Sequence, residues 1–315
     1  LSAADVESDS RAAILRAAAI TIDAAQPLNR QLRVALNQLA IARNDLPEYA
    51  PMRAGALPKQ TLEFANGFGG FVQDSYRIDR LPPAAWSNII ANDAFGALIT
   101  DRGGGFIWHG NSRSGRITAF SNDPLREGWN WMLYLVNEKK RRWMRLLPGS
   151  IPMTDFAALH KCGESEFRGT ADGCAFSVRI AMHDAGVYLD VRAAVREECA
   201  IVCAVDWLMG TDRRDAAMVR TWSDRGMCFA SGASGAIGYM ACSDPEAVGG
   251  CSLRDFTAGG DLMQPRGFDA LNRRGGGWIL KIPIRENKNK CGILIGSAPD
   301  VRSAYAVARA FRMRP

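Results

Sequence analysis

One segment, residues 86–124, holds the side chains of this sequence that are best suited to bind a ligand. It combines tryptophans with amide, carboxylate and guanidinium groups, and the candidate binding residues are Trp86, Trp108, Asn111, Arg113, Arg116, Asn122 and Asp123. A sugar offers hydroxyl groups around its rim and an apolar C–H face, which hydrogen-bonding side chains and flat aromatic rings complement. The segment therefore predicts a carbohydrate-binding surface.

A purely structural interpretation of the same residues stays open. The tryptophans could belong to the core, and Ser121 to Pro124 reads as an ordinary turn. Arg113 and Arg116 could position their loop by contacting backbone carbonyls or carboxylates, or they could line a sugar or phosphate pocket, which guanidinium groups suit.

No catalytic residue, metal ligand or cofactor site is predicted. The histidines His109, His160 and His183 lie far apart and have no ligand spacing, and the sequence contains no GxSxG motif. The run Gly67 to Gly70 lacks the helix and the acidic residue of a dinucleotide site. Carboxylates such as Asp101 occur in turn or strand patterns, where surface or capping roles account for them.

The candidate residues are organised by a predicted β-hairpin. Residues 95–100 and 106–108 are apolar, β-branched and aromatic, and the five residues between them are Asp-Arg-Gly-Gly-Gly. Glycines tolerate the positive φ angles that tight turns require. The hairpin places Trp108 on a strand and Asn111 to Arg116 in the loop that follows it.

From residue 62 onward the apolar pattern has the period of two that is typical of strands. Residues 186–196 alternate best, and residues 201–209 read as one strand covered on both faces. Further strands are expected at residues 132–137, 142–146, 174–182, 227–231, 236–242, 278–284 and 291–296. Residues 249–277 read as a long loop. Many strands with short glycine-rich turns predict an all-β sandwich or barrel.

Helical patterns occur only near the two ends of the sequence. Residues 9–43 are rich in Ala, Leu, Arg and Gln and are interrupted by Pro27, so two helices are expected there. Residues 44–60 contain three prolines and read as a connector. Residues 298–313 show helical spacing again.

Composition narrows the class of protein. The 315 residues carry a net charge of +6, but the Lys and Arg residues are scattered, which argues against a nucleic-acid partner. The eight cysteines form no CxxC pair, and buried free thiols in a reducing compartment account for them. No run approaches the roughly 18 apolar residues of a membrane span, and no signal peptide is recognised, so a cytoplasmic location is expected.

Several short motifs, in order and with matching spacing, resemble the N-terminal domain of glycoside hydrolase family 94. This family includes cellobiose and chitobiose phosphorylases and the phosphorylase part of cyclic β-1,2-glucan synthases. The similarity covers roughly residues 60–300, and its motifs are Asn66 to Phe71, Pro82 to Asn92, Phe95-Gly96, Asn111 to Arg113, Arg116 to Thr118 and Ser121 to Pro124. The sequence departs from the family where Cys162 follows Lys161, and again at residues 251–260.

The resemblance implies a fold and a division of the chain. The expected fold is all-β, a large antiparallel two-sheet super-sandwich of the galactose-mutarotase-like type with an N-terminal helical segment. Residues 1–58 would form that segment and its connector, residues 59–298 the super-sandwich, and residues 299–315 the start of a linker helix. In the family, a catalytic (α/α)6 barrel follows.

The resemblance also implies a function. The chain would be the N-terminal sandwich of a β-glucan-active glycoside phosphorylase or cyclic β-1,2-glucan synthase, and would not be catalytic alone. Its expected partners are a β-glucan or oligosaccharide, the helical barrel that supplies the acid, and a second copy in a homodimer. Inorganic phosphate would be a co-substrate of the parent enzyme. The resemblance also allows the parent enzyme to be associated with an inner membrane. A non-catalytic glucan-binding or dimerisation module is the alternative.

Overall fold

The structure is a computed structural model that describes residues 25, 27–28, 31, 52–53, 61–120, 130–148, 153–212, 214–258, 265–273 and 276–313. The chain divides into two compact units, Leu1–Pro47 and Glu48–Pro315. The helices expected in residues 9–43 and the connector at 44–60 lie almost entirely outside the described residues. The predicted boundary at residues 58/59 and the role of residues 299–315 as a linker stay predictions, and the account below concerns the second unit.

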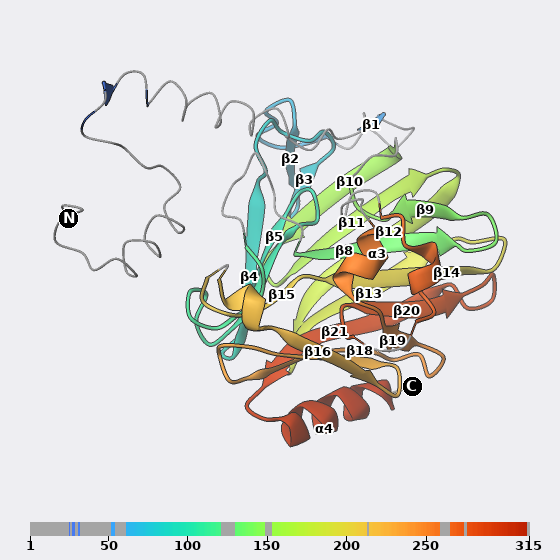
Figure 1. Ribbon diagram of the computed structural model, residues 1–315. Coiled ribbons are helices and arrows are strands. Elements are labelled where there is room, and N and C mark those ends of the chain that lie inside the picture. The colour runs from blue at the N-terminus through green and yellow to red at the C-terminus, as the bar shows by residue number, and fades with distance from the viewer. Residues whose placement is uncertain are drawn as a thin grey trace. The chain divides into compact units, whose positions relative to one another are not determined.

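One layer of this unit is a large sheet of eleven strands (Figure 1). Its neighbours are antiparallel except for the first strand, which pairs in parallel with β10. In spatial order the strands are β16 (Arg220–Asp224), β17 (Met227–Ser231), β18 (Ile237–Cys242), β21 (Lys290–Ala298), β13 (Gly186–Ala193), β12 (Cys174–His183), β11 (Glu164–Ala171), β10 (Met153–Lys161), β3 (Ser75–Ile78) and β2 (Gly69–Val72), with β1 (Met52–Arg53) beside β10.

The opposite layer consists of two five-stranded antiparallel sheets. One contains β19 (Val248–Gly250), β20 (Ile279–Ile284), β14 (Cys199–Val205), β8 (Trp131–Asn137) and β9 (Arg142–Arg145). The other contains β15 (Trp207–Gly210), β7 (Arg116–Thr118), β6 (Gly105–His109), β5 (Phe95–Thr100) and β4 (Ser87–Ala91).

The two smaller sheets meet at Asp206, between β14 and β15. Its carbonyl accepts a hydrogen bond from the backbone N–H of Ala119 (2.9 Å), and its own N–H donates to the carbonyl of Asn130 (2.8 Å). The single strand predicted for residues 201–209 is therefore wrong in one respect, because the chain passes from one sheet to the other at Asp206. The two sheets together complete the second layer of the sandwich.

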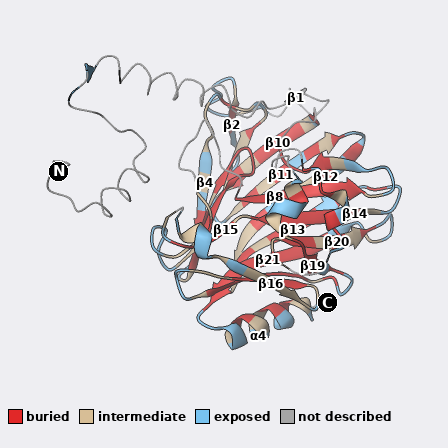
Figure 2. Ribbon diagram, in the orientation of Figure 1, coloured by how far each residue is buried: buried red, intermediate tan, exposed pale blue. Residues whose placement is uncertain are grey.

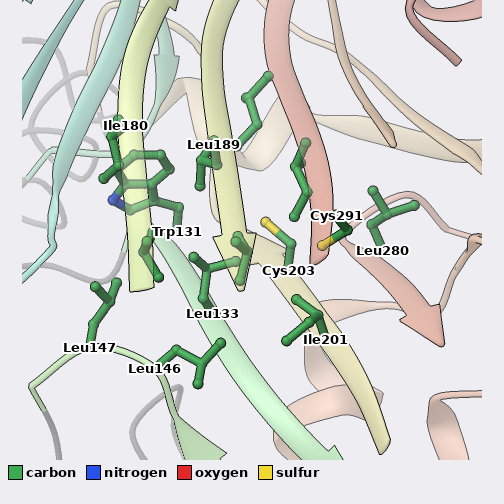
Figure 3. Close-up of a cluster of buried hydrophobic side chains, with 14 of the residues drawn as sticks. Trp131, Leu133, Leu146, Leu147, Ile180, Leu189, Ile201, Cys203, Leu280 and Cys291 are labelled. Atoms are coloured by element: carbon green, nitrogen blue, oxygen red, sulfur yellow. The ribbon is translucent and has the colours of Figure 1, made fainter. Parts of the chain in front are cut away.

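The core lies between the layers. In Figure 3, Leu133 of β8 and Cys203 of β14 point toward Leu189 of β13 and Cys291 of β21. All four are at most 5% exposed. Alternate residues of these strands face the core, which is why the sequence period of two predicted them. Burial concentrates in the strands, as Figure 2 shows.

Two helical segments cover outer faces of the sandwich. The helix α4 (Val301–Arg312) lies on β18 and β21 and buries Ala304, Ala308 and Phe311. The short helix α3 (Leu253–Thr257) and the 3-10 turn η3 (Phe268–Ala270) pack on the outer face of β8 and β14. A further 3-10 turn, η2 (Asp215–Met218), precedes β16. None of the described helices is long and apolar enough to span a membrane.

The loop predicted for residues 249–277 is therefore partly wrong, because it contains β19, α3 and η3. Ser252 caps α3 by accepting a hydrogen bond from the backbone N–H of Asp255 (3.0 Å), and Phe256 is fully buried. The other strand predictions, the hairpin and the final helix are confirmed. The eight cysteines are all free, and six of them are buried.

Candidate functional site

Trp108 lies on the face of the β4–β7 sheet that points away from the core. Ile107 on the same strand belongs to the core between the layers, so the neighbouring residues Phe106 and Trp108 face outward. Trp108 pairs with Gly96 of β5, and a Cβ atom at Gly96 would come within 2.2 Å of the indole ring. The glycine thus lets the half-buried ring lie closely over the neighbouring strand.

Other aromatic rings and an arginine continue this face. Phe106 stacks on Phe120 with ring centroids 4.1 Å apart, and its centroid lies 5.0 Å from that of Trp108. The guanidinium carbon of Arg116 lies 5.7 Å from the centroid of Phe106 and 5.8 Å from that of Phe120. We call Phe106, Trp108, Phe120 and Arg116 the aromatic face. Cation–π contact holds Arg116 in place there.

The loop after Trp108 is held by its own polar side chains. The Oδ1 atom of Asn111 accepts hydrogen bonds from the backbone N–H groups of Arg113 (2.8 Å) and Ser114 (3.0 Å). The Nε of Arg116 donates to the carbonyl of Ser112 (3.0 Å). Asn111 and Arg116 therefore shape the loop. Arg113 is exposed, and its guanidinium has no hydrogen-bond or ion-pair partner among the described residues.

Trp86 lies apart from the other candidates. It precedes Ser87, which pairs with Thr100, whereas Trp108 pairs with Gly96 at the far end of the same strand, about 13 Å away at roughly 3.3 Å per residue. Its ring makes edge contacts with Phe68 and Tyr76, each at 5.9 Å between centroids. The structure therefore brings together Trp108, Asn111, Arg113 and Arg116, and Trp86 packs elsewhere. Asn122 and Asp123 lie outside the described residues.

Two histidines contact serines, but neither pair is extended by a carboxylate among the described contacts. His160 Nδ1 lies 2.9 Å from the Oγ of Ser165, which also accepts a hydrogen bond from Asn88 (3.2 Å). Burial lowers the pKa of His160 to about 4, so its imidazole is neutral near pH 7. His109 Nδ1 lies 3.3 Å from the Oγ of Ser297. Within the described part of the chain, no group of three or more His, Cys, Asp or Glu residues is placed to hold a metal ion.

A cleft of about 680 Å³ at one end of the sandwich was not predicted from the sequence. Its lining comes from three separate parts of the chain, within residues 135–144, 172–174 and 194–199. No local pattern connects segments that only the fold brings together.

Comparison with known proteins shows which group the chain resembles. Residues 75–186 match the family model described as glycosyl hydrolase 94, supersandwich domain. A cyclic β-(1,2)-glucan synthase, NdvB, from Rhizobium meliloti is 26% identical over 180 residues. That match covers 50% of this chain and 6% of NdvB, so the chain spans a small part of the length of this relative.

Among solved structures, a bacterial glucoamylase complexed with acarbose is 8% identical, with a TM-score of 0.44, over 81% of this chain and 37% of that one. A 4-α-glucanotransferase from Thermococcus litoralis is 9% identical, with a TM-score of 0.32, over 69% and 40%.

The family match and the two-layer all-β architecture agree with the resemblance seen in the sequence motifs. The matched residues run from β3 to the start of β13, and thus include the hairpin and the loop that carries Arg113. Over residues 75–186 the chain is thus similar to the supersandwich domain of glycosyl hydrolase family 94.

Proposed function

We propose that this chain is the N-terminal sandwich of a longer β-glucan-active protein, either a glycoside phosphorylase or a cyclic β-1,2-glucan synthase. In this proposal it binds glucan and assembles with a catalytic helical barrel. The observation that carries the proposal is the aromatic face, where Trp108 is half-buried beside the exposed loop of Arg113.

The aromatic face suits a sugar for two reasons. The ring of Trp108 offers a flat apolar surface, and Phe106 and Gly96 fix its position. Arg113 and Ser114 are exposed at the same end of the strand and can hydrogen-bond to hydroxyl groups. An immobilised ring next to free polar groups can bind a ligand with little loss of side-chain entropy.

The catalytic step would require a second domain. Phosphorolysis of a glycoside needs a general acid that protonates the leaving oxygen, while inorganic phosphate acts as the nucleophile. In the proposed assembly the barrel supplies the acid and the sandwich helps to hold the glucan. Incubating the chain with phosphate and either cellobiose or β-1,2-gluco-oligosaccharides should yield no glucose 1-phosphate, and its formation would overturn this division of labour.

Binding is tested by titrating the chain with β-1,2-gluco-oligosaccharides while tryptophan fluorescence is followed. We expect a saturable change that is smaller in Trp108→Ala, because the ring that reports binding at the aromatic face is removed, and that Arg113→Ala shifts to about tenfold higher oligosaccharide concentration. Arg220→Ala is the matched control, because Arg220 is also exposed but begins β16 of the other layer. No saturable change in the unmodified chain, or an undiminished one in Trp108→Ala, contradicts the proposal.

A dimerisation module is the second candidate, and Ile89 favours it. Ile89 is 64% exposed, and its pairing with Leu98, which in turn pairs with Phe106, continues the aromatic face with further apolar side chains. Exposed apolar patches of this kind often mark protein interfaces. Light scattering decides between the candidates: a dimer that Ile89→Asp dissociates supports this function, and a monomer at all concentrations counts against it.

A further inference from the structure

The cleft at the end of the sandwich lies where the two layers separate. It is bounded by the turn between β8 and β9, the turn between β11 and β12, and the connection from β13 to β14. Its volume of about 680 Å³ lies within the range of roughly 300–1,000 Å³ of small-molecule sites. None of the residues of the aromatic face lines it.

The floor of the cleft is apolar. Leu135, Met144 and Val195 belong to the core between the layers, yet they are 5–8% exposed, whereas Leu189 deeper in the same core is fully buried. The core therefore reaches the solvent at this end of the sandwich, and the floor of the cleft offers an apolar surface to a ligand.

The rim of the cleft is charged, and most of its charges are paired across the opening. Lys140 in the β8–β9 turn forms an ion pair with Glu197 (2.7 Å), and Arg142 on β9 forms one with Asp172 in the β11–β12 turn. These side chains are 43–59% exposed. Arg196 adds a third cation, which has no ion-pair partner among the described residues.

We propose that this cleft binds a short neutral oligosaccharide, as a second glucan subsite separate from the aromatic face. The C–H face of a sugar would lie on the apolar floor, and its hydroxyl groups would hydrogen-bond to the ammonium, guanidinium and carboxylate groups of the rim. Two of the three cations are already neutralised by carboxylates, which favours an uncharged ligand over an anion. The choice of a glucan rests on the proposed function.

Two cysteines allow the cleft to be probed directly. Cys199 lines the cleft and is partly exposed, whereas Cys162 is exposed in the turn between β10 and β11 and does not line it. β-1,2-Gluco-oligosaccharides should slow the alkylation of Cys199 several-fold in the intact chain and leave that of Cys162 unchanged, as measured by mass spectrometry of the labelled peptides. The protection should persist in Trp108→Ala, because the aromatic face is a different site.

Neighbouring lysines provide the matched pair of variants. Lys140 and Lys139 lie in the same turn and form ion pairs with Glu197 and Glu198 respectively, but only Lys140 lines the cleft. We expect Lys140→Ala to raise the oligosaccharide concentration needed for half-maximal protection of Cys199 about tenfold, and Lys139→Ala to leave it unchanged.

Three results would contradict the cleft proposal, and each can be told apart from a failure of the proposed function. If oligosaccharide changes tryptophan fluorescence through Trp108 but does not protect Cys199, the cleft is not a glucan subsite, and the proposed function stands. Equal protection of Cys162 would show a nonspecific effect and overturn the proposal. Equal protection by inorganic phosphate alone would assign the cleft to anions and overturn the choice of a neutral sugar.

Discussion

The outer faces of the two five-stranded sheets are built from similar residues but are covered differently. On one, Trp108 lies beside Phe106 and Phe120, with Arg116 over the rings. On the other, Trp143 contacts Phe256 and Phe268, with centroids 5.2 Å and 4.6 Å away. There Arg141 lies over Phe268 at 5.0 Å.

The two faces differ in whether a described helix packs over the aromatic rings. Phe256 of α3 packs against both Tyr134 and Trp143, so the second face forms a secondary core under α3. The described α-helices pack away from the first face, whose strand β4 carries exposed residues (Figure 2). Tryptophan, phenylalanine and arginine in proximity can therefore build either a core or a surface for a ligand, depending on whether a short helix packs over them.

The largest expected effect is on the covered face. Phe256→Ala should lower the free energy of unfolding by about 3–5 kcal/mol, because Phe256 is fully buried among aromatic rings. Trp108→Ala on the first face, over which none of the described α-helices packs, should cost only about 1 kcal/mol. Denaturant unfolding measures both, and equal losses would remove the distinction between the faces.

Acid should destabilise both faces together, because they share one core that contains His160. Burial lowers the pKa of His160 to about 4, whereas an unfolded histidine titrates near 6.5. The unfolded chain therefore binds the proton first, so this contribution is complete above about pH 6.5 and is lost between pH 6.5 and 4. The loss is on the order of 3 kcal/mol. Unfolding of His160→Gln across this range should lack this part of the pH dependence.

Removing the N-cap of α3 should loosen the second face and leave the first face unchanged. Ser252→Ala deletes the hydroxyl that accepts a hydrogen bond from the N–H of Asp255, and should cost about 1 kcal/mol. The emission of Trp143 should shift to longer wavelength as its cover loosens, and glucan binding through Trp108 should stay the same. A variant with weakened binding would show that the two faces are coupled.

The smallest effect on stability, with a clear effect on binding, is expected at Gly96. The added methyl group of Gly96→Ala would collide with the indole of Trp108, which is half-exposed and can move aside at a cost of about 1 kcal/mol or less. The displaced ring should bind oligosaccharide less well in the fluorescence titration. Undiminished binding would mean that the position of Trp108 over β5 is irrelevant.

Local signals in the sequence predicted much of this fold. The glycines after Asp101 predicted the hairpin, and the alternation of residues 186–196 predicted β13. Helix α3 escaped prediction because it has only five residues and depends on the burial of Phe256 against Trp143, which lies far away in the sequence. The change of sheet at Asp206 likewise depends on hydrogen bonds to distant segments.

The candidate site could be predicted only in part. The sequence placed Trp108 next to the loop of Asn111 and Arg113, because all three belong to one continuous segment. It also grouped Trp86 with them, but strand pairing puts Trp86 at the opposite end of β5. The sequence does not show whether a ring faces the core or lies on an outer face until strand register and cover are known.

The buried thiols can report how often the folded sandwich opens. Cys203, Cys228 and Cys242 have no exposed surface, and burial raises the pKa of Cys228 to about 12. A thiol reagent can reach them only when the layers part, so each modified molecule records one opening event. The rate at which these native cysteines are modified thus measures the lifetime of the folded state without an engineered probe residue.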